Sequence, residues 1–189
     1  MPLHSFQALP FQDLSGWRMA GRGSFAPVEP GVIESRGGPG LLWYAAQVYE
    51  NLVLRICWRV QSLEDNSGIF VRCPPLQDEI QPAIDRGYEI QIDERGLDPE
   101  RNVQGSAYHM TGAIYTVSPA VCKASRPIGE WNEFNCLVQG SIIEVELNGV
   151  RVASLQSASR EPRGHIALQA HHEGSLVQFK DLRIRRLDD

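Results

Sequence analysis

The sequence lacks the features that mark several common classes of protein. No apolar run approaches the roughly 20 residues needed to span a bilayer. The net charge of −5 over 189 residues provides no basic face for nucleic acid. The first residues lack the charged and then apolar build of a signal peptide. The chain as given is therefore expected in the cytoplasm, or in the periplasm or outside the cell if a leader was removed. Neither nucleic acid nor a membrane is an expected partner, and the oligomeric state stays open.

Cysteine motifs are also missing. The four cysteines, Cys57, Cys73, Cys122 and Cys136, are widely spaced and form no CxxC pair, so a zinc site has little support. Cys57 and Cys136 lie within apolar strand patterns and are expected to be small buried hydrophobic residues. No Gly-x-Ser-x-Gly elbow occurs, which disfavours a serine hydrolase.

Short alternating segments recur along the whole chain, whereas helical periodicity is weak. Strands are expected at 52–60, 68–73, 88–93, 113–115, 133–139, 142–147, 150–155, 165–171 and 176–184. Asn148-Gly149 is a typical two-residue hairpin turn, and residues 31–34 and 41–44 are expected to form a hairpin around residues 37–40. With 17 Gly and 12 Pro between short strands, the pattern predicts an all-β sandwich or barrel. No linker divides the chain, so one domain is expected over residues 1–189.

The segment 88–93 alternates apolar and polar residues without exception. Strand side chains point to opposite faces with period two, so Glu89, Gln91 and Asp93 share one face. Strands disfavour two carboxylates and an amide in one row, and such a row indicates either a solvated outer face or a ligand-binding groove. The strand-poor stretches 74–87 and 94–111 flank this strand, and loops of that length are often functional.

The spacing of the two acids bears on mechanism. At about 3.3 Å per residue, the α-carbons of Glu89 and Asp93 are about 13 Å apart. The carboxyl groups of paired-carboxylate glycosidases are only about 5 to 9.5 Å apart. The two acids are therefore expected to act separately.

Nine motifs, in order along the chain, resemble the 3-keto-disaccharide hydrolase domain family. They are residues 11–17 (FQDLSGW), 49–54 (YENLVL), 66–72 (NSGIFVR), 87–93 (GYEIQID), 111–115 (TGAIY), 129–132 (GEWN), 147–150 (LNGV), 164–171 (GHIALQAH) and 177–184 (VQFKDLRI). The resemblance covers nearly the whole chain and implies a concanavalin A-like jelly-roll sandwich of two antiparallel sheets. The loop 94–102 departs from the family, whose loop is often longer and acidic or Asn-rich.

The resemblance also implies an activity, the cleavage of glycosidic bonds of 3-keto-sugars. A ketone at carbon 3 acidifies the neighbouring C–H bond, so a base removes that proton and the leaving group departs. Water then adds to the resulting enone. This chemistry needs a base, an electrophile for the enolate oxygen and an acid for the leaving group.

Four residues are candidates for these catalytic roles. Glu89 or His171 is the expected base, and Asp93 is the remaining acid or a ligand. Arg72 is the expected electrophile and shares a strand face with Phe70, from which it could pair with Glu89 or Asp93. A purely structural salt bridge is the alternative for Arg72, and a hydrogen-bonded structural histidine is the alternative for His171.

Six further residues are candidates for substrate binding: Asn66, Ser67, Gln91, Tyr115, Trp131 and Gln169. A turn is the alternative for Asn66 and Ser67, and a place in the core is the alternative for the two aromatic residues. His109 lies in the loop after the polar strand, where it could reach the same groove.

The sequence requires no cofactor. Glu89, Asp93 and His171 offer oxygen and nitrogen atoms that suit a divalent ion, but no contiguous ligand motif is present, and no residue is assigned to a metal. Two other functions stay open. One is a non-catalytic carbohydrate-binding module of the lectin-like sandwich type, and the other is a structural or assembly domain.

Overall fold

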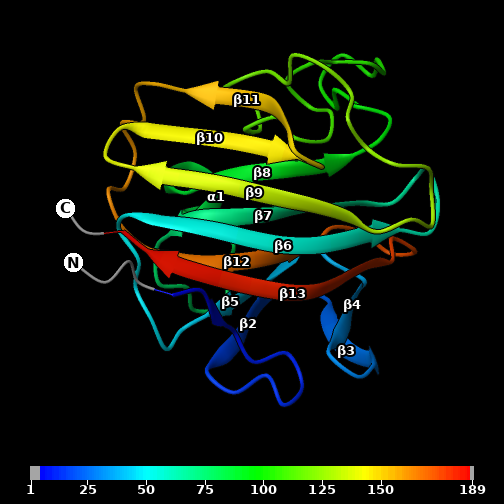
Figure 1. The fold of residues 1–189 in the computed structure, drawn as a ribbon. Helices are drawn as coiled ribbons and strands as arrows, with labels where there is room; N and C mark the ends of the chain where they lie inside the picture. The colour runs from blue at the N-terminus through cyan, green and yellow to red at the C-terminus, as the bar shows by residue number, and fades with distance from the viewer. Residues whose placement is uncertain (1–4, 188–189) are drawn as a thin grey trace.

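Two antiparallel sheets face each other in the structure, a computed structural model that describes residues 5–187 (Figure 1). The larger sheet has the order β11 (Val150–Leu155), β10 (Ile142–Leu147), β9 (Asn132–Gln139), β6 (Leu52–Val60), β13 (Val177–Arg186), β4 (Val32–Arg36) and β3 (Ser24–Glu29), and β1 (Gln7–Ala8) also pairs with β13. The smaller sheet has the order β2 (Trp17–Gly21), β5 (Gly40–Tyr44), β12 (His165–Ala170), β7 (Asn66–Cys73) and β8 (Tyr88–Asp93). The predicted all-β, two-sheet sandwich is confirmed. The ends of the expected 1–189 domain, residues 1–4 and 188–189, lie outside the described residues.

The main core lies between the sheets because each strand turns its apolar side chains inward. Tyr88, Ile90 and Ile92 of β8 are fully buried there, which confirms the apolar face predicted from alternation. Leu54 and Trp58 of β6 are fully buried in the same core from the opposite sheet. Glu89, Gln91 and Asp93 therefore point to the outer face of the smaller sheet.

The hairpin expected around residues 37–40 is wrong. Strand β4 pairs with β3 and β13 in the larger sheet, whereas β5 pairs with β2 and β12 in the smaller one. The turn between them includes Gly37 and Gly38 with φ of 66° and 136°, a region open to glycine. The chain thus crosses from one sheet to the other here, while the expected hairpin at Asn148-Gly149 does form between β10 and β11.

A second apolar layer covers part of the outer face of the smaller sheet. Leu76 and Ala83, from the segment 74–87, belong to one buried cluster with Leu41, Trp43 and Phe70. This segment contains the helix α1 (Gln81–Arg86), which has a proline in its first turn where no amide hydrogen is needed. The sequence did not predict this helix because six residues are too few to display a helical period.

The segment 111–118 runs beside β8 and extends the edge of the smaller sheet. The amide of Gln91 donates to the carbonyl of Ala113 at 3.0 Å, and the amide of Tyr115 donates to the carbonyl of Glu89 at 2.9 Å. The strand expected at 113–115 is therefore not formed as a regular strand, and only isolated bridges at Ile114 mark the pairing. It brings the long loops after β8 alongside the polar face.

Two smaller expectations concern the cysteines and the membrane. All four cysteines are free; Cys136 is buried as expected, but Cys57 is only half-buried because its strand position faces the outside of the larger sheet. Within residues 5–187, no helix has the length and apolar character that crossing a membrane requires.

Candidate functional site

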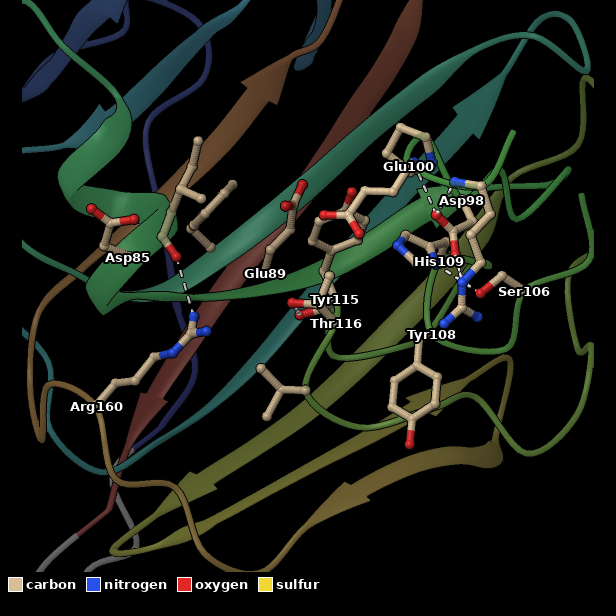
Figure 2. Close-up of a pocket in the computed structure, with 15 residues that line it drawn as sticks. Asp85, Glu89, Asp98, Glu100, Ser106, Tyr108, His109, Tyr115, Thr116 and Arg160 are labelled. Carbon is tan, nitrogen blue, oxygen red and sulfur yellow. Dashed lines mark hydrogen bonds and ion pairs between the residues drawn. The ribbon is translucent and has the colours of Figure 1, made fainter. Parts of the chain in front are cut away.

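A cleft of about 880 Å3 opens on the outer face of the smaller sheet. Its floor includes Phe70 of β7 and Glu89 of β8, and one wall includes Ile84 and Asp85 of α1. The loop residues that line it are Asp98, Pro99, Glu100, Arg101, Ser106, Tyr108, His109, Tyr115, Thr116, Val117 and Arg160. Figure 2 shows Glu89 between the α1 side of the cleft and the side formed by Tyr115 and His109. Glu89 of the polar face of β8 thus lies in a groove, while Gln91 and Asp93 of the same face are buried, so this face is not a solvated surface.

Glu89 is the carboxyl group on the floor of this cleft. Its pair partner across the strands is Phe70, and its Oε1 atom is buried without a hydrogen-bond partner. Burial raises the pKa of Glu89 to about 8, because an apolar setting disfavours the charged form. A carboxyl group with this pKa can gain or lose a proton near neutral pH.

The position of the Glu89 carboxyl depends on Gly68 of β7. A Cβ atom at residue 68 would overlap the Oε1 atom of Glu89 and lie 2.6 Å from its Cγ. The absence of a side chain at residue 68 therefore leaves a space on β7, and the carboxyl of Glu89 from β8 occupies this space. Gly68 is not among the positive-φ residues, so the space above it, and not backbone strain, is what the glycine provides.

The loop wall beside Glu89 is held by its own contacts. The rings of His109 and Tyr115 meet edge to face with centroids 5.0 Å apart, and Ser106 Oγ lies 2.7 Å from His109 Nδ1. Burial, and then the charge of Glu89, raise the pKa of Tyr115, which keeps the phenol protonated. Asp98 accepts the amide hydrogens of Glu100 and Arg101, and the bond from Arg101 lowers its pKa.

Asp93 shares the face of Glu89 but holds the following loop in place. It is fully buried, and its carboxyl accepts the amides of Arg95 at 2.9 Å and Leu97 at 3.1 Å. It also accepts the side-chain amide of Asn66 at 3.2 Å and lies 3.7 Å from Arg95 Nε. Asp93 is not among the residues that line the cleft, so the structure gives it a role in positioning.

Replacing Asp93 by alanine is expected to lower the free energy of unfolding by about 3 kcal/mol, since it leaves several buried donors unpaired. Urea unfolding followed by tryptophan fluorescence measures this. Asp93→Asn is the matched variant, and it should lose less because one acceptor oxygen remains. An alanine variant as stable as the parent would contradict this role.

His171 follows β12 near the far end of the polar row. Its Nδ1 atom lies 2.8 Å from Nδ1 of His172. Burial, and then the neighbouring His172, lower the pKa of His171 to about 4, so the imidazole is neutral at pH 7. His171 is not among the residues that line the cleft with Glu89.

The structure separates Arg72 from the acids with which it was expected to pair. Its backbone has φ of 53°, and the pairing of β7 with β12 shifts by one residue at this point. This bulge breaks the alternation, and the buried guanidinium donates to the carbonyl of Gly140 at 2.6 Å, in the turn between β9 and β10. Within the described residues no ion pair joins Arg72 to Glu89 or Asp93, and burial lowers the pKa of Arg72.

Ser67 and Trp131 also lie away from the cleft. Ser67 is fully buried and donates to the backbone carbonyl of Gln169 at 2.6 Å. Trp131 lines a separate hollow on the larger sheet. Lys180 Nζ and Arg59 Cζ lie over its ring at 4.1 and 4.6 Å from the centroid, so two cationic side chains cover this ring.

Asn66, Gln91 and Gln169 are buried near Glu89. The amide of Gln91 donates to Asn66 Oδ1 at 3.4 Å. Gln169 belongs to β12 and is the strand neighbour of residues 67–68. Of the predicted site residues, Glu89 and Tyr115 line the cleft itself, and these three lie behind it.

The three residues considered for a metal are not assembled as a ligand set. The oxygens of Asp93 face amide donors, and the Nδ1 atom of His171 faces His172. In the described part of the chain, no group of three His, Cys, Asp or Glu residues is placed to hold a metal ion. These residues therefore do not fit a divalent ion, and no metal is assigned to the site.

Several cleft residues were not predicted from the sequence, among them Asp85, Ser106, Tyr108, Thr116 and Arg160. They lie on α1 and on loops, where no hydrophobic period marks which way a side chain points. The composition of the loop 94–111, rich in polar residues after an acidic strand, was the one available signal.

The fold and the cleft place the chain in the class of lectin-like jelly-roll sandwiches. A crystal structure of a protein from Parabacteroides distasonis, named as a candidate glycosyl hydrolase, superposes with a TM-score of 0.79 at 24% identity, covering 97% of this chain and 100% of that one. Carbohydrate binding module CBM66 from Bacillus subtilis superposes with a TM-score of 0.61 at 10% identity, covering 90% and 95%. At these identities the likeness concerns the fold alone.

The chain belongs to the family of 3-keto-alpha-glucoside-1,2-lyase-like domains, which matches residues 10–185. The chain is similar to the 3-keto-disaccharide hydrolase of Bacteroides thetaiotaomicron, with 26% identity in an alignment of length 221 that covers 92% of this chain and 75% of that protein. The family predicted from the nine motifs is therefore confirmed.

Proposed function

We propose that this protein cleaves the glycosidic bond of 3-keto-glycosides by elimination, with Glu89 as the base. The observation that carries the proposal is a single carboxyl group on the floor of the cleft, with its pKa raised to about 8 and its Oε1 atom unpaired. The C–H bond next to a ketone is only weakly acidic. A carboxylate with a raised pKa is therefore a better base for removing this proton than a carboxylate with an ordinary pKa. The family and the name of the similar Bacteroides protein support the substrate class.

The reaction balances with one base and one proton donor. Glu89 takes the proton from carbon 2, the C1–O bond breaks, and a C1=C2 double bond forms beside the ketone at carbon 3. The leaving oxygen takes a proton from a donor in the cleft. When water then adds its oxygen to carbon 1, the protonated Glu89 returns its proton to carbon 2, and the proton lost by the water restores that donor. The cleft offers the phenol of Tyr115, the imidazole of His109 and the guanidinium of Arg160 as donors to developing negative charge.

The test is turnover of matched substrates. The protein is incubated with 3-keto-trehalose and 3-keto-lactose and, in parallel, with trehalose and lactose, each with and without a chelator, and sugar release is measured by chromatography. The proposal expects release from the keto-sugars alone, because the unoxidised sugars lack the acidified C–H bond. Binding of any of these sugars without cleavage would instead favour a carbohydrate-binding module, and would overturn the proposal.

The activity is expected to depend on pH in one direction. Only the ionised form of Glu89 accepts a proton, so kcat/KM should rise about tenfold per pH unit below the pKa of about 8 and level off above it. A pH–rate profile from pH 5.5 to 9.5 on 3-keto-trehalose measures this. A profile that falls through pH 8 would make Glu89 an acid and would contradict its assignment as the base.

A further inference from the structure

Unpaired oxygen atoms gather at one place on the outer face of the smaller sheet. Among the described residues, three buried side-chain oxygens have no hydrogen-bond partner: Oε1 of Glu89, of Gln91 and of Gln169. Gln91 and Gln169 are 3% and 9% exposed. A buried acceptor without a donor is costly, so three of them on one face indicate a donor that this protein holds there.

The three oxygens surround Gly68. Gln91 is the strand partner of Gly68 on β8, and the pairing of Leu168 with Ile69 makes Gln169 its neighbour on β12. The Glu89 carboxyl lies directly over Gly68. Since adjacent strands are about 4.8 Å apart, one small molecule between the Glu89 carboxyl and the two amides can reach all three side chains.

The orientation of the Gln91 amide follows from a chain of hydrogen bonds. The carboxyl of Asp93, which faces the amide donors of Arg95 and Leu97, accepts from Asn66 Nδ2, so the Asn66 oxygen faces the other way. That oxygen accepts from Gln91 Nε2. The remaining atom of the Gln91 amide, its carbonyl oxygen, is therefore turned away from Asn66 and left unpaired beside Gly68.

A water molecule together with a protonated Glu89 has enough hydrogen atoms for all three oxygens. A water molecule has two hydrogens to donate, one for each amide oxygen, and its lone pairs can accept one more hydrogen. A protonated Glu89 supplies that hydrogen, and all three oxygens are then paired. An ionised Glu89 would add a third acceptor to a water with two hydrogens, so one oxygen would stay unpaired.

We propose that one water molecule lies between the Glu89 carboxyl and the amides of Gln91 and Gln169, and that these two glutamines, with Gln91 oriented through Asn66 by Asp93, are positioning residues that hold Glu89 as a neutral acid at rest. This inference rests on the proposed function only for its consequence in catalysis. The raised pKa of Glu89 agrees with it. The other titratable or charged groups of the cleft that holds Glu89 are Asp85 from α1 and, from the loops, Asp98, Glu100, Arg101, Tyr108, His109, Tyr115 and Arg160. Asp93 and His171 lie further along the polar row, with Arg95 and His172 as their partners.

A measurement without substrate tests this proposal. The melting temperature of the parent protein is measured from pH 4 to 10 and compared with that of the Glu89→Gln variant. The same comparison is made for each further variant, with and without Glu89→Gln. The folded-state pKa of Glu89 is raised from 4.5 to about 8, so stability from the neutral acid is lost between these pH values. The melting temperature of Glu89→Gln should therefore rise relative to that of the protein with Glu89 as the pH increases above 4.5, and this difference should level off near pH 8.

Gln91→Met and Gln169→Met, made separately, remove one amide each while keeping the volume. Each is expected to lower the pH at which the stability difference levels off by about one unit, a tenfold loss of proton affinity of Glu89. With one amide oxygen removed, the water has a hydrogen free to donate to the ionised Glu89, so the ionised form is less disfavoured. Asn66→Ala should act in the same direction, since Gln91 can then turn its amide nitrogen toward Glu89. Gln178→Met, at a buried glutamine of the larger sheet, is the matched control, and its stability difference should still level off near pH 8.

Opposite or absent shifts in both Gln91→Met and Gln169→Met would overturn the proposal, because loss of a polar group alone would disfavour the ionised acid and raise the pH at which the difference levels off. A crystal structure without an ordered water within about 3 Å of the three oxygens would also overturn it. Since neither readout uses a sugar, their failure is distinct from a failure of the protein to cleave keto-glycosides.

Discussion

Glu89→Gln is expected to lower kcat on 3-keto-trehalose by about 1,000-fold at pH 8, within the range that a general base contributes. Glutamine keeps the size of the side chain and its place over Gly68, but it cannot accept a proton from carbon. KM should change little, because the cleft walls stay the same. Initial rates of sugar release over a range of substrate concentrations separate the two constants.

Two comparisons make the result specific to the base. Glu133→Gln removes an exposed carboxyl group on β9, on the opposite sheet, and should retain the parental rate. Above pH 8, Glu89→Gln should also melt at a higher temperature than the parent. The expected gain in unfolding free energy is about 1 to 3 kcal/mol, after allowance for the partial exposure of the Glu89 side chain. A Glu89→Gln protein that keeps the parental kcat would remove Glu89 from the mechanism.

The sequence was sufficient for the faces of individual strands, because alternation is a local property. It placed Tyr88, Ile90 and Ile92 in the core and set Glu89 on the opposite face, where the cleft lies. The family also followed from ordered motifs, since nine short matches in sequence constrain the whole chain. Both conclusions depend on residues that are close together along the chain.

The sequence was insufficient wherever a residue's direction is set by a distant strand. Arg72 turns inward because β7 carries an extra residue against β12, and no pattern in 66–73 reveals this bulge. Trp131 precedes β9 of the larger sheet, and its ring is covered by Arg59 and Lys180 from the neighbouring strands β6 and β13. The walls of the cleft come from loops and from α1, which have no period that could orient their side chains.

Gly68 begins the strand expected at 68–73, and in the structure its lack of a side chain leaves the space that the Glu89 carboxyl occupies. Gly68→Ala is expected to lower kcat on 3-keto-trehalose by about 100-fold or more, because the added Cβ overlaps Oε1 of Glu89 and lies close to Cγ. The Glu89 carboxyl must move away from residue 68, and displacements near 1 Å lower the rate about 100-fold. The fold should be kept, since the backbone at residue 68 is not in the left-handed region and alanine reduces the entropy of the unfolded chain.

A double-mutant cycle separates this effect from a general loss of activity. If Gly68→Ala acts through Glu89, adding it to Glu89→Gln should lower kcat little further, because the displaced group is already inactive. Circular dichroism and thermal melting check that the alanine variants remain folded. Independent, multiplicative losses in the double variant would show that the methyl group disturbs the cleft by another route. Gly68 would then support the cleft in general and not the Glu89 carboxyl in particular.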